Sequence, residues 1–279
     1  MARRARKSRK RRSRFALPRV RIPSRRTRAR WARDFARRPL SIQALAACAV
    51  IVVVWFVANG VYQVVRKPTE LFFPVSHALY KTPAETWRAY APIFRAHSTA
   101  VMTPELLAAL AQVEGSGNPV VRTYWRWSMT LEPFSVYRPA SSAVGMFQIT
   151  DGTFEASKRY CIHDHRVVED GPWNHWRSCW FNALYTRVVP SHAVEMTSAY
   201  LDRNVSDLLA RRGIRRATLE QKRTLAALIH LCGAGAGDAY VRRGLAFAPG
   251  QRCGDHDARA YVARVMSMSA TFRRLADER

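Results

Sequence analysis

Residues 39–65, PLSIQALAACAVIVVVWFVANGVYQVV, contain no charged residue, and this run constrains the fold more than any other feature of the chain. A bilayer core about 30 Å thick is crossed by roughly 20 helical residues, so the run is long enough to span it. A buried core helix is seldom this long and uniform. A cleaved signal peptide has a shorter apolar region of about 7–15 residues that ends in small residues. With these two alternatives kept, we predict a single membrane-spanning helix.

The basic residues are distributed very unevenly around this run. Residues 1–38 hold 18 Arg and Lys and one acid, Asp34, whereas the remaining 241 residues hold 28 basic and 19 acidic groups. Because positive residues stay on the cytoplasmic side of a membrane, residues 1–38 are predicted to be a cytoplasmic tail. The chain from about residue 70 is then expected in the periplasm, attached to a bacterial inner membrane through residues 39–65.

The tail itself has two interpretations. Its cationic side chains could bind nucleic acid. The sequence has few aromatic residues and no visible fold, however, which favours a disordered topology signal that rests on anionic lipid. We therefore expect no nucleic-acid partner.

Four cysteines in the exported part agree with an oxidising compartment, where disulfides form. Three pairings are possible, and we favour the local one, Cys161 with Cys179 and Cys232 with Cys253. A metal site built around the segment CIHDH is the alternative, but its spacing matches no zinc pattern.

The exported part is predicted to be mainly α-helical. Residues 66–98 form a linker and a leading helix, in which Thr82 and Glu85 make a capping box and Pro92 should kink or end the helix. Residues 99–279 form one domain, with no strand alternation longer than a few residues. Its helices are expected around residues 102–115, 151–160, 191–211, 219–232 and 256–274.

Glu114 is the strongest candidate for chemistry. It continues the apolar stripe of Leu107 and Ala111 at the end of a helix, so its carboxyl should point toward the core. Burial and the negative end of the helix dipole both disfavour its charged form and would raise its pKa. An acid that stays protonated near neutral pH is suited to general acid catalysis.

The ordered motifs EGSGNP (114–119) and SSAVGMFQIT (141–150) resemble those of the soluble-type lytic transglycosylases, whose fold is akin to goose-type lysozyme. Glu114 matches the family's catalytic acid, Asn118 and Pro119 its Asn-Pro pair, and residues 145–148 its Gly-Leu-Met-Gln motif. The similarity covers roughly residues 100–268. Three later segments also match in order: AYLDRN (199–204), LAALIHLCGAGAG (225–237) and YVARV (261–265).

The chain departs from the family pattern at its serines and at one tyrosine. Gly115 stands where the family has Ser, although Ser116 is adjacent, and Ser141 or Ser142 must replace a second serine. The family Tyr that bonds the catalytic carboxyl falls on His230. A charged His230 would lower the pKa of Glu114 and weaken it as an acid, so the protonation state of His230 matters.

The resemblance implies a lysozyme-like helical domain that cleaves the β-1,4 bond between N-acetylmuramic acid and N-acetylglucosamine in peptidoglycan glycan strands. Glu114 alone would act as acid and then base, giving a 1,6-anhydro sugar, with no cofactor and no metal ion. The expected substrate-binding residues are Ser141, Gly145, Phe147, Gln148, His230 and Tyr261.

Two alternative functions stay open, and so does the choice of aromatic residues that would bind sugars. A second acid, for which Glu132 and Asp151 are the nearest candidates, would make the protein a lysozyme-type hydrolase. The altered serines and His230 also allow a catalytically silent peptidoglycan-binding scaffold, within some envelope machinery. Aromatic platforms for sugars could come from Tyr124, Trp125, Trp127, Phe134, Tyr137, Trp173, Trp176 and Trp180.

Overall fold

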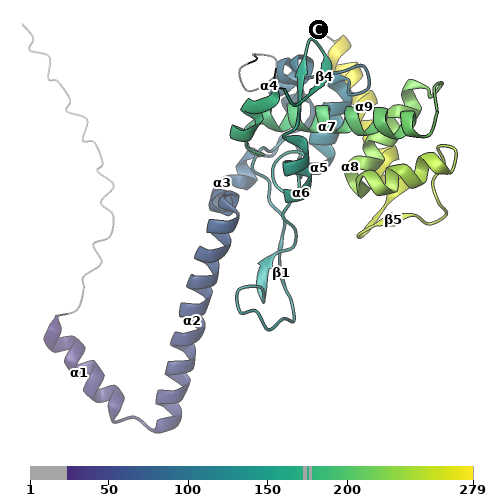
Figure 1. Cartoon of the computed structure of the whole chain (residues 1–279). Coiled ribbons are helices and arrows are strands. Elements are labelled where there is room, and N and C mark those ends of the chain that lie inside the picture. The colour runs from purple at the N-terminus through teal and green to yellow at the C-terminus, as the bar shows by residue number, and fades with distance from the viewer. Residues whose placement is uncertain (1–23, 172–174, 176–177, 279) are drawn as a thin grey trace, which may run out of the picture. The chain divides into compact units, whose positions relative to one another are not determined.

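The computed structural model describes residues 24–171, 175 and 178–278 and is mainly helical in that part of the chain, as expected (Figure 1). The chain divides into two compact units, Met1–Ala58 and Asn59–Arg279. The boundary falls inside the long apolar helix, so the last turns of that helix belong to the second unit.

The first unit contains helix α1 (Arg25–Ala36) and most of helix α2 (Leu40–Arg66). The prediction of a tail without a fold is wrong for α1; residues 1–23 lie outside the described residues. Helix α1 forms because the Ser24 side chain accepts a hydrogen bond from the Thr27 backbone N–H, and Arg and Ala, which dominate the segment, are good helix formers.

Helix α2 has the length and composition to cross a membrane, and its 18-residue apolar window is not buried inside the protein. Among the described residues a second helix passes the same test, α8 (Leu219–Arg242). Leu225 and Leu228 of α8 are fully buried, so α8 belongs to the core of the second unit.

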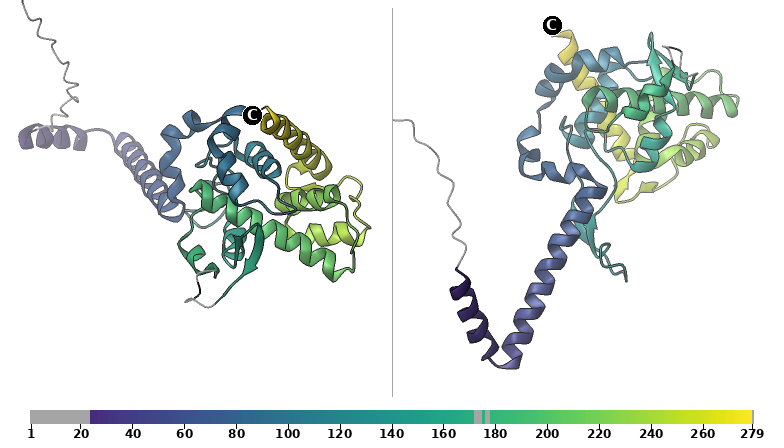
Figure 2. Two further views of the ribbon diagram at one scale, coloured as in Figure 1. Left: turned by 90° about the horizontal axis from the view of Figure 1, so that it is seen from above. Right: turned by 60° about the vertical axis from the view of Figure 1, so that its left-hand side comes forward.

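The core of the second unit is built around helix α5 (Pro104–Gly115), whose residues Leu106 to Ala111 are all fully buried. Helices α4 and α9 pack against it, and α8 packs on both α7 and α9 (Figure 2). The remaining helical elements are η1 (Pro68–Phe72), α3 (Phe73–Ser76), η2 (His77–Leu79), α4 (Pro83–Ala96), α6 (Asp151–Ser157), η3 (Cys179–Leu184), α7 (Pro190–Arg211) and α9 (Ala258–Asp277).

Helix α4 confirms one expectation and corrects another. The capping box between Thr82 and Glu85 is present in both directions. The helix does not end at Pro92, however, but continues to Ala96. Ala91 and Phe94, on either side of the proline, are fully buried. Their packing holds the last turn in a helical conformation despite the missing hydrogen bond.

Helix α8 extends beyond the expected end at residue 232 because it consists of two helical pieces joined at Gly233. This glycine has φ 78° and ψ 169°, a backbone conformation that side chains with a Cβ rarely adopt. The break places a change of direction directly after the segment that carries His230.

The described residues form three two-stranded antiparallel sheets, which were not expected from the sequence. Each is a short ribbon with at most four residues per strand, too short to produce a clear alternation of apolar and polar residues. The pairs are β1 (Trp125–Trp127) with β2 (Tyr137–Pro139), β3 (Tyr160–His163) with β4 (Arg166–Glu169), and β5 (Arg252–Cys253) with β6 (His256–Asp257).

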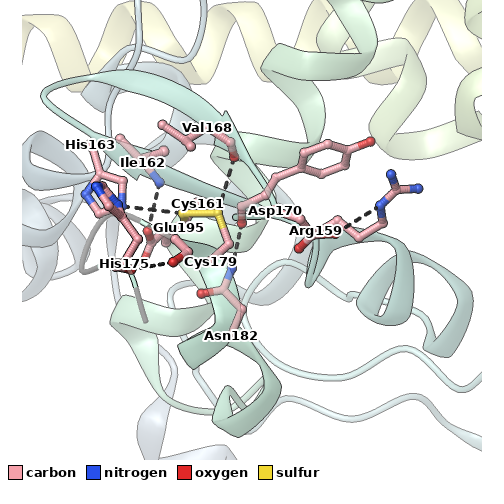
Figure 3. The surroundings of a disulfide bond; sticks show 12 residues. Arg159, Cys161, Ile162, His163, Val168, Asp170, His175, Cys179, Asn182 and Glu195 are labelled. Carbon is pink, nitrogen blue, oxygen red and sulfur yellow. Dashed lines mark hydrogen bonds and ion pairs between the residues drawn. A yellow bond between two sulfur atoms is a disulfide. The ribbon is translucent and has the colours of Figure 1, made fainter. Parts of the chain in front are cut away.

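Both predicted disulfides are confirmed, Cys161–Cys179 and Cys232–Cys253. The first joins β3 to η3, and the Asn182 side chain supports this connection by donating to the Tyr160 carbonyl at 2.6 Å (Figure 3). Because both sulfurs are bonded to each other, they are not available as thiolate ligands for the metal site considered from the sequence.

Candidate active site

Glu114 lies in the last turn of α5, where three helices meet. The hydroxyl of Tyr261, on α9, donates to Oε1 of Glu114. His230, on α8, places its Nε2 3.7 Å from the same oxygen. The Glu114 side chain keeps 18% of its surface exposed, so it faces inward without being sealed from solvent. In the described part of the chain both contacts fall on Oε1, which leaves Oε2 for a ligand.

Burial favours the neutral form of His230. It lowers the pKa of His230 from its usual value of 6.5, and this effect outweighs the opposing effects of Glu114 and of a hydrogen bond with the Phe147 backbone. Burial also raises the pKa of Tyr261 well above its usual value, with Glu114 adding to the increase, so Tyr261 stays a hydrogen-bond donor. The charged state of His230 that would have weakened Glu114 as an acid is therefore disfavoured.

A cavity of about 210 Å³ lies beside this group, between α6, α7 and α8. Glu114 does not line this cavity. His230 does line it, and its ring also lies beside the Glu114 carboxyl. The polar residues of the lining are Gln148, Thr150, Thr153, Ser157, Thr197, Tyr200 and His230. Such a mixture of hydroxyl, amide and imidazole groups is suited to a neutral polyhydroxylated ligand.

Gln148 is held in place at the cavity wall. Its backbone has φ 47°, an uncommon value for a residue with a side chain. Its amide nitrogen donates to the Gly145 carbonyl at 2.9 Å. Gly145 itself has φ 78°, and an added Cβ would lie 2.3 Å from the Arg187 carbonyl oxygen. The motif at 145–148 therefore needs glycine at its first position for both space and conformation.

The structure gives a reason for Gly115 in place of the family serine. A Cβ at this position would lie 2.9 Å from both the Met146 Cα and a Val121 methyl carbon. The loop that carries Gln148 therefore packs directly on the backbone that follows Glu114. Asn118 completes this junction: it is fully buried and donates to the Ser76 carbonyl at 2.8 Å.

Apart from Gly145, which is buried in the turn described above, the expected substrate-binding residues fall into three groups. Gln148 and His230 line the cavity. Phe147 and Tyr261 are buried, so Phe147 contributes packing and Tyr261 acts on Glu114. Ser141 instead lines a separate hollow of about 160 Å³. The binding roles assigned to these residues stay predictions.

Two of the cavity residues on α7 had no clear signal in the sequence. Thr197 and Tyr200 both line the cavity, and the buried hydroxyl of Thr197 has no hydrogen-bond partner in the described part of the chain. Tyr200 falls in the segment AYLDRN that resembles the family, but nothing in that segment indicates which face of the helix meets the site.

The two candidates for a second catalytic acid are engaged by other groups. Asp151 pairs with Arg187 at 2.8 Å, and Glu132 accepts a hydrogen bond from the Ser135 hydroxyl at 3.0 Å. Both side chains are exposed, and Asp151 lies in the first turn of α6, so their positions are those of surface and helix-terminus groups.

Most of the proposed aromatic platforms are not in the cavity. Tyr124, Trp125, Trp127, Phe134 and Tyr137 lie on or beside the β1–β2 hairpin. Trp180 is 43% exposed and stacks on Phe181. Trp173 and Trp176 lie outside the described residues.

Glu195 on α7 is a buried glutamate whose neighbours resemble those of Glu114. Its carboxylate accepts hydrogen bonds from the Ile162 backbone N–H at 2.9 Å and from the Tyr185 hydroxyl at 2.7 Å. His97 Nδ1 lies 3.7 Å from it. Both carboxylate oxygens of Glu195 therefore have donors within the protein.

Comparison with known proteins adds no family assignment: no protein-family model matches the chain, and no curated protein matches it significantly. The motifs and the geometry around Glu114 are the features of the chain that bear on its function.

Proposed function

We propose that this chain is a membrane-anchored peptidoglycan lytic transglycosylase with Glu114 as its single acid and base. The observation that carries the proposal is the Glu114 carboxyl, which is held by Tyr261 and lies beside His230, a residue that lines a cavity with both polar and apolar groups. The ordered motifs at 114–119 and 141–150 supply the reaction class by resemblance, together with a lysozyme-like fold for residues 99–279.

In this mechanism Glu114 protonates the bridging oxygen between N-acetylmuramic acid and N-acetylglucosamine. The acetamido group of the substrate stabilises the oxocarbenium-like centre. Glu114, now a carboxylate, removes the proton from the C6 hydroxyl of the muramic acid, which attacks C1. The leaving sugar keeps the first proton, so the bond cleavage consumes no water and leaves a 1,6-anhydro end.

The neighbours of Glu114 suit both halves of this cycle. Tyr261 donates to the carboxylate that forms after the first proton transfer, while a neutral His230 adds no positive charge that would hold Glu114 ionised beforehand. The excess of basic groups in residues 39–279 favours an acidic polymer such as peptidoglycan. Helix α2 would anchor the domain on the periplasmic side of the inner membrane.

Product analysis tests the proposal. Purified protein is incubated with peptidoglycan sacculi, and the released muropeptides are measured by mass spectrometry. We expect 1,6-anhydro ends from the wild type and none from Glu114→Gln. Glu105→Gln, the same substitution at the other end of α5, is the matched control and should retain activity. Reducing ends would indicate a hydrolase, and equal inactivity of wild type and Glu114→Gln would indicate a scaffold.

A further inference from the structure

The β1–β2 hairpin exposes large apolar side chains that the site does not use. Trp127 is 62% exposed, and Met129 and Leu131 in the connecting loop are fully exposed. Two views show the hairpin projecting out of the helical body of the second unit (Figure 1, Figure 2). Side chains of this kind at the tip of a projecting loop are typical of a surface that binds another apolar phase.

The two faces of the hairpin differ in character. Arg126 lies directly opposite Arg138 in the strand register, and Trp127 lies opposite Tyr137. Because neighbouring residues on a strand point to opposite faces, one face carries two arginines and the other carries aromatic rings, whose centroids are 4.6 Å apart. Like charges placed directly opposite each other destabilise a hairpin. An anion bound to the arginine face of the hairpin would reduce the repulsion between Arg126 and Arg138.

The hairpin is attached to the last turns of α2, within the same unit. The Asn59 side chain donates to the Tyr137 carbonyl at 2.7 Å, and the Gln63 side chain donates to the Phe134 carbonyl at 2.6 Å. The ring of Tyr62 stacks on that of Phe134 with centroids 4.9 Å apart. Polar residues on an otherwise apolar helix are therefore used to bind the hairpin backbone.

The base of the hairpin is held by a buried charge. Glu70, just after α2, has a side chain that is 2% exposed. It accepts hydrogen bonds from the Trp125 ring nitrogen and from Arg122, both at 2.8 Å, and pairs with Lys67 at 3.5 Å. These contacts fix the hairpin to the end of α2.

The position along α2 sets the depth of the hairpin in a bilayer. A span of about 20 residues that begins at Leu40 ends near Asn59. Asn59 would then lie at the far boundary of the hydrocarbon core. Tyr62 falls in the interfacial region, where Tyr and Trp are enriched, and Arg66 lies beyond it. The hairpin is thus bound at the level where hydrocarbon gives way to headgroups.

We propose that the loop of this hairpin, residues 128–136, inserts into the extracytoplasmic leaflet of the same membrane that α2 spans. Met129 and Leu131 lie among the acyl chains, Trp127 and Tyr137 lie at the interface, and Arg126 and Arg138 contact lipid phosphates. Arg138 also lines the hollow of about 160 Å³ with Arg66, Lys67, Arg187 and one acid, Asp151, so the lining carries more basic than acidic groups. This inference rests on the membrane anchoring proposed above.

The charges favour lipid over a second copy of the chain as the partner of this surface. Two copies that met through the hairpins would bring four arginines together, whereas a phospholipid surface supplies phosphate for each of them.

Fluorescence quenching in vesicles tests the insertion. The full chain carrying Cys48→Ala and Met129→Cys is labelled with an environment-sensitive nitrobenzoxadiazole probe and reconstituted in vesicles of phosphatidylethanolamine and phosphatidylglycerol. We expect blue-shifted emission, strong quenching by lipids with a shallow acyl-chain nitroxide, and little quenching by iodide in the buffer. The matched control, Cys48→Ala with Leu219→Cys, places the probe at an exposed leucine of α8 and should show the reverse.

The outcomes separate this inference from the proposals on which it rests. The wild-type chain labelled at Cys48 reports on α2 itself. Lipid quenching at Cys48 without any at position 129 would overturn the hairpin insertion alone, whereas no lipid quenching at either position would also remove the anchor. Protection of position 129 from both quenchers would indicate contact with a second copy and would overturn the insertion. Adding Leu131→Glu should reduce lipid quenching at position 129. The muropeptide assay tests the proposed enzymatic activity separately from the hairpin insertion.

Discussion

Two glutamates in the second unit have similar neighbours and different surroundings. Glu114 has Tyr261 and His230, and Glu195 has Tyr185 and His97, with the histidine nitrogen 3.7 Å away in both cases. The Glu195 side chain is 8% exposed and receives an additional backbone donor, whereas that of Glu114 is 18% exposed and adjoins a cavity. The comparison indicates that a Glu–Tyr–His group stabilises the fold when every oxygen is bonded and can support chemistry when one oxygen is left for a ligand.

The largest effect should come from removing the acid of the first group. Glu114→Gln should lower the rate of anhydromuropeptide release by about 10²–10⁴-fold, the usual contribution of general acid–base catalysis. Its thermal unfolding midpoint should stay close to that of the wild type. A variant that loses stability as much as activity would mean that Glu114 has the same structural role as Glu195.

The matching change at the second group should affect stability instead. Glu195→Gln places an amide NH₂ against the donors of Ile162 or Tyr185, so one donor loses its partner. We expect the free energy of unfolding to fall by about 1–3 kcal/mol, measured by urea denaturation. The product pattern of the remaining folded protein should be unchanged, and a change in it would show that Glu195 belongs to the active site.

Removing the tyrosine hydroxyl from each group gives a finer distinction. Tyr261→Phe should lower the rate at least about tenfold, because a hydrogen bond to a charged group contributes about 1.5–3 kcal/mol. Tyr185→Phe should leave the rate unchanged and lower the unfolding midpoint. Equal rates in Tyr261→Phe and wild type would show that the Tyr261 hydroxyl does not act on Glu114 during the reaction.

The smallest effect concerns pH. Burial lowers the pKa values of His97, His192 and His230 below 6.5, so the folded state binds fewer protons than the unfolded state. Stability is therefore full above pH 6.5 and falls as the pH drops from 6.5 toward the folded-state pKa values. Urea denaturation between pH 7.5 and 5 should show this decrease. The free energy of unfolding should change less steeply with pH in His230→Gln than in the wild type. An unchanged pH dependence would contradict a depressed pKa for His230.

Features that depend on neighbouring residues in the sequence could be predicted. The capping box at Thr82, the helix that carries Glu114 and the two local disulfides all follow from short-range patterns, and the structure contains each of them. Pro92 was expected to kink or end its helix, and it does not end it, because tertiary packing of Ala91 and Phe94 outweighs the local preference.

Features that depend on distant residues could not be predicted in the same way. Tyr261 and Glu114 are 147 positions apart, and only the packing of α9 against α5 brings them together. The motif comparison placed a carboxyl-bonding tyrosine at His230, yet in the structure Tyr261 makes the hydrogen bond and His230 approaches the same oxygen. The β1–β2 hairpin was missed because three-residue strands carry too little alternation to detect.

The short segment between α2 and α4 limits where Glu114 can act. Between Arg66 and Pro83 the chain is mostly helical, and Glu70 within it is buried, so this segment is not a loose tether. If α2 is fixed in a bilayer, the folded unit that carries Glu114 is joined to the membrane by only this short segment. An enzyme attached in this way would cut glycan strands that come near the membrane, so the location of a bond in the wall would matter as well as its chemistry.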